Sequence, residues 1–303
     1  MPQLSICIVN WNVKDYLEKC LESIYRNTKD VTFEMIVVDN NSSDNSMDMI
    51  KNKFPSVILI ENKKNLGFST ANNQGIKASK GKYILVLNPD TIILEDAIEK
   101  MVDFMDRNKN VGALGPKIFE QNKVVSTSAM EFPTVYTEII YLLMSKRKRL
   151  NELKIDSFGY NRTDEVDALS GCCIMFRKEA LKKAGLFDEQ FFMYGEDVEL
   201  CYRVKQSGYK NFFLPESQII HYGGKSNEQN PEISIFGFIS TYKLLKKIYG
   251  RLAAFIYRIA SLFISMAKVI LFSFFILFTK DKNRLQSKIF NYLRIIKFSI
   301  LNN

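Results

Sequence analysis

The chain has 303 residues, of which 47% are hydrophobic and 25% charged, a balance that excludes an intrinsically disordered protein. The formal charge of +9 is unevenly placed, because the segment from residue 243 onward holds twelve Lys and Arg against one acid, Asp281. The preceding 242 residues carry 30 basic and 32 acidic side chains, which argues against nucleic-acid binding there and directs the basic tail toward an anionic partner.

Cysteine and histidine usage narrows the chemistry. The five cysteines are odd in number and lack CxxC spacing, so we expect reduced, buried thiols. The single histidine, His221, excludes most zinc sites and Ser-His-Asp triads. Met1 to Gln3 lead directly into an apolar run, so we expect no signal peptide and a catalytic body in the cytoplasm.

Strand and helix patterns alternate through the first 108 residues. The runs LSICIVN (4–10), FEMIVVD (33–39) and YILVL (83–87) are continuously apolar, as in strands buried on both faces. A further strand is expected at 57–60, with helices at 13–27, 46–53, 69–79 and 95–108. This alternation predicts an α/β fold with a mostly parallel sheet, right-handed crossovers and flanking helices.

The middle of the chain has weaker periodicity. Residues 117–161 include a basic cluster at 146–149 and few regular patterns, so we expect a long, mobile connection. Order returns at 166–177, and the pattern then predicts a helix at 196–207 and strands near 211–214 and 218–221.

The last sixty residues combine apolar and basic side chains. Residues 252–278 are strongly apolar but contain Arg258 and Lys268, and the uncharged stretch 269–279 is shorter than the about 20 residues of a membrane span. A second amphipathic stretch follows at 289–301. This pattern predicts helices lying in the interface of an anionic membrane. The alternatives are a helix packed on the body or in an oligomer interface, and a true span of 252–278.

Polar residues follow three of the expected strands, at Asn10–Asn12, Asp39–Asn41 and Asn88–Asp90. The carboxyl ends of parallel strands meet at one edge of the sheet, where an open α/β fold binds its ligands. Asp39 and Asp90 are therefore candidates to hold a nucleotide and a hard divalent cation. Taken singly, each is equally well explained as a helix cap or turn residue.

A glycine- and amide-rich run, from Asn65 to Gly75, opens the helix expected at 69–79. Gly67 permits close backbone approach, and free N–H groups at a helix start suit a phosphate or a polar base. A capped helix with a glycine turn is the competing interpretation.

The strongest local signal is Glu196 and Asp197 at the first turn of the helix expected at 196–207. Negative charge is favoured there by the helix dipole, and successive helical residues point about 100° apart, so one carboxyl can face a cleft. The preceding segment, 187–194, is rich in aromatic residues, as is typical of a partly dry cleft wall. Ordinary helix capping is the alternative.

Seven motifs occur in an order similar to that of the inverting GT-A glycosyltransferases of family 2, especially their rhamnosyltransferase-like branch. They are IVNWN (8–12), VDNNSSD (38–44), NLGFSTANNQG (65–75), LNPD (87–90), LSGCCIMFRKEAL (169–181), FDEQFFMYGEDVELCYR (187–203) and HYGGKS (221–226). The resemblance covers residues 4 to about 226 and implies a GT-A, Rossmann-like fold and metal-dependent, inverting hexosyl transfer.

Site roles follow from the resemblance together with the residue patterns. Asp197 would be the general base, and Glu196 would bind acceptor or support the base. Asp90 would be the surviving acid of a metal motif that often carries two acids, with His221 approaching the metal or diphosphate unless it is a core histidine. Nucleotide contacts are expected from Val9, Asn10, Asp39, Asn65, Gly67, Asn72 and Asn88. Candidate phosphate or acceptor contacts are Gly171, Arg203, Lys225 and Ser226.

The implied cofactor is Mg²⁺ or Mn²⁺, and the best donor is dTDP-L-rhamnose, with UDP-sugars as the alternative. The acceptor would be a lipid-linked glycan, such as one on polyprenyl diphosphate, used for cell-wall or other surface polysaccharide. The enzyme would lie on the cytoplasmic face of the membrane as a peripheral or monotopic protein that binds no nucleic acid.

The expected division is a catalytic domain at 1–242 and a basic amphipathic tail at 243–303. Within the catalytic domain, residues to about 116 would bind nucleotide and 117–242 would bind acceptor. Two rival functions remain at this point. A nucleotidyltransferase would need a Gly-rich, basic loop after the first strand, which Asn10–Asn12 does not resemble. A non-catalytic membrane scaffold would retain the fold without needing its acids.

Overall fold

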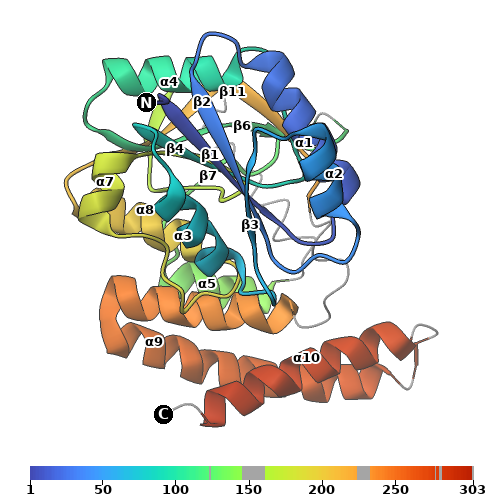
Figure 1. Cartoon of the computed structure of the whole chain (residues 1–303). Helices are drawn as coiled ribbons and strands as arrows, with labels where there is room; N and C mark the ends of the chain where they lie inside the picture. The colour runs from blue at the N-terminus through green and yellow to red at the C-terminus, as the bar shows by residue number, and fades with distance from the viewer. Residues whose placement is uncertain (123, 145–160, 224–232, 277, 280–281, 302–303) are drawn as a thin grey trace. The chain divides into compact units, whose positions relative to one another are not determined.

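A computed structural model describes the whole chain except residues 123, 145–160, 224–232, 277, 280–281 and 302–303 (Figure 1). The chain divides into two compact units. The first comprises Met1–Phe132 and Ile155–Gln229, and the second comprises Pro133–Lys154 and Asn230–Asn303. Lys225 and Ser226, expected near phosphate or acceptor, and the basic cluster at 146–149 lie outside the described residues.

The first unit is built on one mixed sheet with the strand order β3-β2-β1-β4-β10-β6-β11-β5, and β8 pairs with β11. Its strands are β1 (Leu4–Asn10), β2 (Phe33–Asp39), β3 (Ile58–Glu61), β4 (Tyr83–Leu87), β5 (Thr91–Ile93), β6 (Val111–Phe119), β8 (Asp164–Val166), β10 (Cys173–Arg177) and β11 (Lys210–His221). Strands β1 to β4 are mutually parallel, whereas β10 runs antiparallel to both β4 and β6. The expected α/β fold is confirmed.

Helices flank this sheet in Figure 1, with α3 on one side of the strands and α1 on another. They are α1 (Lys14–Asn27), α2 (Ser46–Lys53), α3 (Phe68–Ala78), α4 (Ala97–Arg107), α7 (Lys178–Ala184) and α8 (Glu196–Gln206). The core forms where the apolar face of α1 meets β1, for example Leu17 and Leu21 against Ile6 and Ile8, all fully buried. Burying each such side chain contributes roughly 1.5–3 kcal/mol, so this packing fixes the edge of the sheet that carries the polar residues.

The middle of the chain is more regular than its sequence suggests. The expectation of a connection without regular structure from 117 to 161 was wrong for the described part. Strand β6 continues to Phe119, β7 (Ala129–Met130) pairs with β9 (Ala168–Leu169), and α5 spans Val135–Leu143. The two strands expected near 211–221 are one strand, β11, whose pairing with β6 shifts register between Leu214 and Gln218. The residues at this irregularity, 215–217, separate the two apolar runs, which is why the sequence pattern predicts two strands.

The second unit is helical and consists, in its described part, of α5, α9 (Ile233–Phe275) and α10 (Lys282–Leu301). Helix α9 is broken at Gly250, where φ is +88° and ψ is −179°. The hydrophobic core of the second unit joins all three helices. It contains Ile235, Phe238, Leu245, Tyr257 and Ile295, with Val135, Ile139 and Leu142 packed against them. Figure 1 shows α10 lying alongside α9.

Helix α9 is long and apolar enough to cross a membrane over Ile235–Phe275, and only 17% of its most apolar window is buried. This result rests on length and composition alone, and the range includes the break at Gly250. Lys268, one of the two cations that interrupt the run, donates hydrogen bonds to the Leu142 carbonyl and, over 3.2 Å, to the Tyr292 hydroxyl. These contacts direct the Lys268 ammonium group toward the other helices of the second unit and away from the surrounding solvent or lipid.

Candidate functional site

A cavity of about 370 Å³ opens at the carboxyl ends of β1 and β4 in the first unit. Its lining comes from the ends of these strands, the turn before β10, the first turn of α8 and the end of β11. These segments contribute Val9, Trp11, Asn88, Asp90, Gly171, Glu196, Asp197 and His221, together with Asn65 and Gly67 from the loop before α3. Residues widely separated in the sequence are thus brought to the one edge at which ligands were expected.

Asp197 is fixed in this cavity by two backbone donors. Its Oδ2 accepts a hydrogen bond from the Gly171 N–H at 2.8 Å, and its Oδ1 accepts one from the Val198 N–H at 2.8 Å. Burial raises the pKa of Asp197, while the backbone N–H donors, Gly171 first, act in the opposite direction. The result is an oriented carboxylate whose charge is supported by the start of α8.

Gly171 serves this arrangement by having no side chain. A Cβ at position 171 would lie 3.0 Å from Asp197 Oδ2 and 3.1 Å from its Cβ. Gly171 was expected to contact phosphate or acceptor; its observed contact is with the carboxylate of Asp197, although it also lines the cavity.

Glu196 lines the same cavity and is only 6% exposed. Its Oε2 accepts no hydrogen bond from the residues that the structure describes. Burial raises the pKa of Glu196 well above its usual range, and the neighbouring charge of Asp197 raises it further. The two adjacent carboxyls therefore differ sharply in their environments.

Three of the expected metal or nucleotide residues in the cavity lining lie close to one another. His221 Nε2 lies 3.2 Å from Asp90 Oδ1 and 3.4 Å from Asn88 Nδ2. The His221 side chain is 21% exposed and lines the cavity, so it is not a core histidine. Strand pairing explains the meeting, because β11 places His221 directly opposite Thr91 of β5.

This set of donors fits a divalent cation that also binds a diphosphate. Among the described residues, no three His, Cys, Asp or Glu side chains gather into a metal-binding group. One carboxylate with an imidazole and an amide still offers oxygen and nitrogen ligands, and Mg²⁺ commonly takes one or two carboxylates together with substrate phosphates and water. The chemistry of Asp90, Asn88 and His221 is thus compatible with a cation held jointly with substrate.

Asp39 and Asn10 lie beneath the cavity and bind each other. Paired across β1 and β2, they are joined by a 2.8 Å hydrogen bond from Asn10 Nδ2 to Asp39 Oδ1. The Ser42 N–H donates to Asp39 Oδ2 at 2.8 Å, which orders the turn after β2. Neither side chain is more than 1% exposed, whereas Val9 and Asn40 beside them line the cavity. The assignment of Asp39 and Asn10 to the nucleotide stays a prediction.

Gly67 holds the aromatic segment that precedes α8. It has φ +82°, and a Cβ there would lie 2.7 Å from Phe192 Cδ2 and 2.9 Å from the Phe192 carbonyl oxygen. The Phe68 N–H donates to that same carbonyl at 3.0 Å. Asn65 supports the turn by accepting from the Gly67 N–H at 2.9 Å. The start of α3 is therefore occupied by a protein contact, while Asn65 and Gly67 still border the cavity.

Two neighbouring asparagines of α3, Asn72 and Asn73, differ in their hydrogen-bond partners. Asn73, which the sequence did not single out, donates to the Phe187 carbonyl and to Glu189 Oε1, both at 2.9 Å, and accepts from the Phe187 N–H. Asn72, the predicted nucleotide contact, instead donates to the Phe68 carbonyl within its own helix and is outside the cavity lining. The amide-rich run thus anchors the 187–194 segment.

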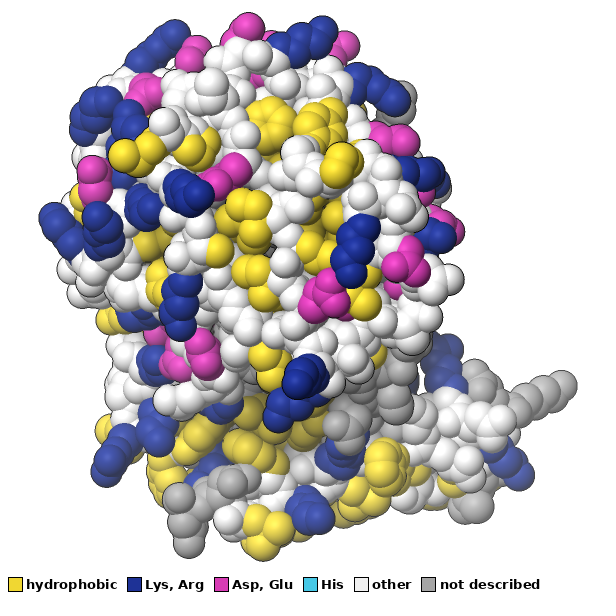
Figure 2. Space-filling model, in the orientation of Figure 1, with side chains coloured by type: hydrophobic (Ala, Val, Ile, Leu, Met, Phe, Trp, Pro, Cys, Tyr) yellow, Lys and Arg dark blue, Asp and Glu magenta, His cyan; other side chains and the backbone are white. Residues whose placement is uncertain are grey.

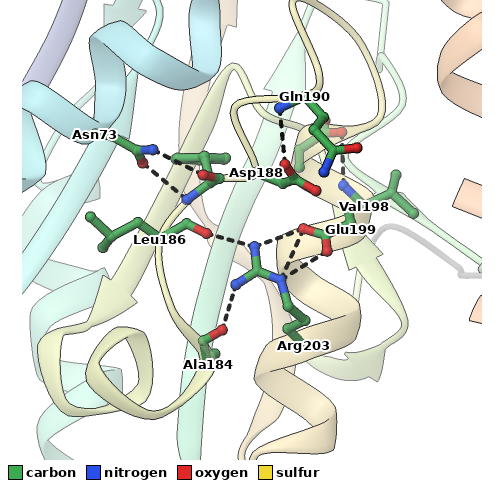
Figure 3. Close-up of polar contacts among 10 residues, drawn as sticks. Asn73, Ala184, Leu186, Asp188, Gln190, Val198, Glu199 and Arg203 are labelled. Carbon is green, nitrogen blue, oxygen red and sulfur yellow. Dashed lines mark hydrogen bonds and ion pairs between the residues drawn. The ribbon is translucent and has the colours of Figure 1, made fainter. Parts of the chain in front are cut away.

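Arg203 is a structural clamp rather than a free cation, as Figure 3 shows. It forms a salt bridge with Glu199 at 2.7 Å, and it donates to the carbonyls of Ala184 and, at 2.6 Å, Leu186. Arg203 is also outside the cavity lining. The arrangement gives no support to a phosphate or acceptor contact by Arg203; the i,i+4 spacing from Glu199 on one helix was the sequence signal for this pairing.

Strained backbone precedes the two carboxyls. Tyr194 has φ +69° and Gly195 has φ +84°, consecutive left-handed residues directly before α8. Tyr194 and Met193 both line the cavity, and Tyr194 is 39% exposed. A non-glycine residue in this region costs of order 1–3 kcal/mol and persists only where its surroundings impose it. Here the anchored segment 187–194 imposes it, and Tyr194 is among the residues that line the cavity.

The described geometry agrees with comparisons against known proteins. Residues 5–185 match the family model "Glycosyl transferase family 2". The chain belongs to this family. Among its relatives, the N-acetylglucosaminyl-diphospho-decaprenol L-rhamnosyltransferase of Mycobacterium tuberculosis is 27% identical over 75% of this chain and 78% of its own length. Rhamnosyltransferase WbbL of Escherichia coli is 26% identical over 73% of this chain and 84% of its own length.

Solved structures support the fold of this family 2 member. A mannosyltransferase from Pyrobaculum calidifontis, solved with GDP-Man and Mn²⁺, superposes with a TM-score of 0.59 at 15% identity, covering 100% of this chain and 88% of the other. TarS of S. aureus superposes with a TM-score of 0.56 at 17% identity, covering 99% and 44%. The rhamnosyltransferase-like resemblance and the GT-A fold are therefore confirmed, and the chain is a family 2 glycosyltransferase.

Proposed function

We propose that this family 2 glycosyltransferase moves a sugar from a nucleoside diphosphate to a lipid-linked acceptor with inversion, using Asp197 as general base. The observation that carries the proposal is the pair of anchors on the Asp197 carboxylate inside a cavity that Asp90 and Asn88 also line. A base fixed in orientation, in a cavity that also holds candidate diphosphate ligands, is the arrangement that direct displacement needs.

The chemistry divides between two parts of the cavity. Asp197 accepts the proton of the attacking acceptor hydroxyl as that oxygen bonds to the anomeric carbon, which contributes about 10²–10⁴-fold to the rate. A divalent cation bound by Asp90 with His221 and Asn88 would neutralise the charge that develops on the departing diphosphate. Met193 and Tyr194 line the cavity and would reduce access of water to the reacting atoms.

Donor and acceptor follow from the relatives' names and from this chain's tail. Two relatives that match three quarters of the chain or nearly so are rhamnosyltransferases, which favours dTDP-L-rhamnose over a UDP-sugar. One of them is named for an N-acetylglucosaminyl diphospholipid, which favours a polyprenyl-diphosphate-linked glycan as acceptor. In this assignment the residues to about 116 bind the nucleotide and 117–242 bind the acceptor.

The site is tested by three purified full-length variants, Asp197→Asn, Asp90→Asn and the control Asp103→Asn on the exposed face of α4. Asp197→Asn is expected to lower kcat by about 10²–10⁴-fold while a thermal-shift titration with dTDP and Mg²⁺ stays as in the parent. Asp90→Asn is expected to weaken the Mg²⁺-dependent part of that titration. Parental kcat in Asp197→Asn would refute the base assignment, and absence of transfer in every variant would favour a non-catalytic scaffold.

The second unit supports attachment to an anionic membrane surface. Large apolar side chains of α9 and α10 are exposed, among them Phe263 (65%), Ile270 (70%) and Phe290 (62%). In the described part of this unit the only acidic residue is Glu138. Figure 2 shows hydrophobic and basic side chains intermingled over these helices. Apolar side chains bordered by Lys and Arg match a lipid interface with anionic headgroups, with the protein peripheral or monotopic.

Membrane binding is tested by vesicle flotation of the full chain with Lys282, Lys288 and Lys297, all exposed on α10, changed to Gln. Each lysine near an anionic surface contributes about 1 kcal/mol, so the triple variant should bind anionic vesicles roughly 100-fold more weakly. A matched variant replaces three exposed lysines of the first unit, Lys29, Lys77 and Lys182, and should bind as the parent does. Equal binding by both variants would refute the electrostatic part, and binding to neutral vesicles unaffected by either would favour a span.

A further inference from the structure

Glu196 lines the cavity but takes no part in the general-base step proposed for Asp197. Its side chain is buried to more than nine-tenths, it lines the cavity, and its Oε2 has no hydrogen-bond partner among the described residues. A buried carboxyl oxygen without a partner costs free energy unless a ligand supplies one. The position therefore indicates a contact that forms only when substrate is bound.

Of the two adjacent carboxyls, Glu196 and Asp197, Glu196 is the one that we expect to be protonated. Asp197 receives the N–H donors of Gly171 and Val198, whereas the Glu196 carboxyl meets the N–H of its own residue and its Oε2 has no partner among the described residues. Hydrogen bonds to the charged form stabilise a carboxylate, and burial without them favours the neutral acid. Two adjacent carboxyls in such different environments divide into one base and one acid.

No cation in the cavity lining opposes this assignment. The other titratable side chains of the lining are Asp90, Cys172, Tyr194, Asp197 and His221, and none of the described lining residues is Lys or Arg. The adjacent Asp197 disfavours a further negative charge on Glu196, and His221 pairs with Asp90 at 3.2 Å. The next acid along α8, Glu199, is paired with Arg203 outside the cavity.

We propose that Glu196 acts as a neutral carboxylic acid whose O–H donates a hydrogen bond to an acceptor hydroxyl beside the one that Asp197 deprotonates. This inference rests on the proposed function and specifies how the enzyme recognises its acceptor. Successive residues in the first turn of α8 point about 100° apart, so Glu196 and Asp197 would reach one acceptor from different directions. Glu196 is thus a positioning residue that selects which acceptor hydroxyl meets the base.

Substitution by glutamine separates hydrogen-bond donation from charge. Glu196→Gln keeps the size and a donating N–H₂ group, so its acceptor KM should stay within about threefold of the parent. Glu196→Ala loses the donor and should raise the acceptor KM about tenfold, with the donor KM unchanged. The parent should lose acceptor affinity as pH rises and Glu196 ionises, whereas Glu196→Gln should not.

A second readout needs no acceptor and no catalysis. The pKa of Glu196 is raised in the folded state, so the folded protein binds a proton that the unfolded chain releases at lower pH. Stability of the parent should therefore fall as pH rises from the usual glutamate pKa of 4.5 through the raised value. Glu196→Gln should lose the part of this fall that Glu196 contributes and keep the part from Asp197, whose pKa burial also raises, while the control Glu179→Gln, an exposed acid on α7, should keep the whole parental fall.

The outcomes separate the inference from the function on which it rests. Melts of Glu196→Gln with the parental pH dependence would show an ionised Glu196 and overturn the inference, whatever the enzyme transfers. A smaller fall than the parent's with an acceptor KM equal to that of Glu196→Ala would overturn the hydrogen bond to acceptor. A smaller fall together with the glutamine rescue of acceptor KM would establish it.

Discussion

Replacing Arg203 by Met tests the clamp between α8 and the segment after α7. The Glu199 side chain is 2% exposed and the Arg203 side chain 25%, so the substitution removes the cation that pairs with a buried carboxylate and the donor to the Ala184 and Leu186 carbonyls. Breaking a buried ion pair from one side costs about 3–5 kcal/mol. Because Arg203 is partly exposed, we expect the lower end, about 3 kcal/mol.

The loss converts into a measurable shift of the melting temperature. For a unit of this size, 1 kcal/mol corresponds to roughly 2–4 °C, so Arg203→Met should melt about 6–12 °C lower by near-ultraviolet circular dichroism. The double variant Glu199→Leu with Arg203→Met removes both charges of the pair and should recover part of this loss. Arg107→Met is the control, since its pair with Asp103 is 81% and 68% exposed and should contribute less than about 1 kcal/mol.

The result also decides between two roles for Arg203. A clamp predicts an unchanged donor KM for the protein that remains folded. A parental melting temperature with a raised donor KM would refute the structural reasoning and restore the phosphate contact expected from the sequence.

Three further substitution or labelling experiments follow from close contacts. Gly67→Ala adopts a backbone conformation that costs about 1–3 kcal/mol and drives a Cβ against Phe192, so both melting temperature and acceptor affinity should fall; parental values would place the 187–194 segment elsewhere. Gly171→Ala presses on the Asp197 carboxylate and should lower kcat about 10–100-fold with parental dTDP binding, and an unchanged kcat would contradict that contact. All five cysteines are buried and free, so maleimide at pH 8 should label the unfolded chain but not the folded one, as mass spectrometry would report. Burial raises the thiol pKa to about 12 for Cys7, Cys20, Cys172 and Cys201.

The N-terminal half of the fold was predictable because its information is local. Continuous apolar runs gave β1, β2 and β4 with the bounds that the structure has, and the polar residues after them marked the ligand-binding edge. Asp197 could likewise be found from its place at the start of a helix beside Glu196.

The remaining features depend on partners that are distant in the sequence. The Gly171 N–H meets Asp197 26 positions later, and Asn73 meets Phe187 114 positions later. No local pattern encodes such pairings, so Gly171 was expected to contact substrate and Asn73 was passed over. Arg203 was a different case, because its partner Glu199 lies one helical turn away and the ion pair was visible in the spacing.

Sugar transfer to a polyprenyl-diphosphate-linked glycan tests the central claim most directly. The full-length enzyme would be given dTDP-L-rhamnose or UDP-sugars with Mg²⁺, beside Asp197→Asn, and the anomeric configuration of the product read by NMR. The account predicts transfer with inversion from one nucleotide sugar, dTDP-L-rhamnose, that Asp197→Asn lacks although it still binds the nucleotide. Retention of configuration, or equal transfer by Asp197→Asn, would contradict it.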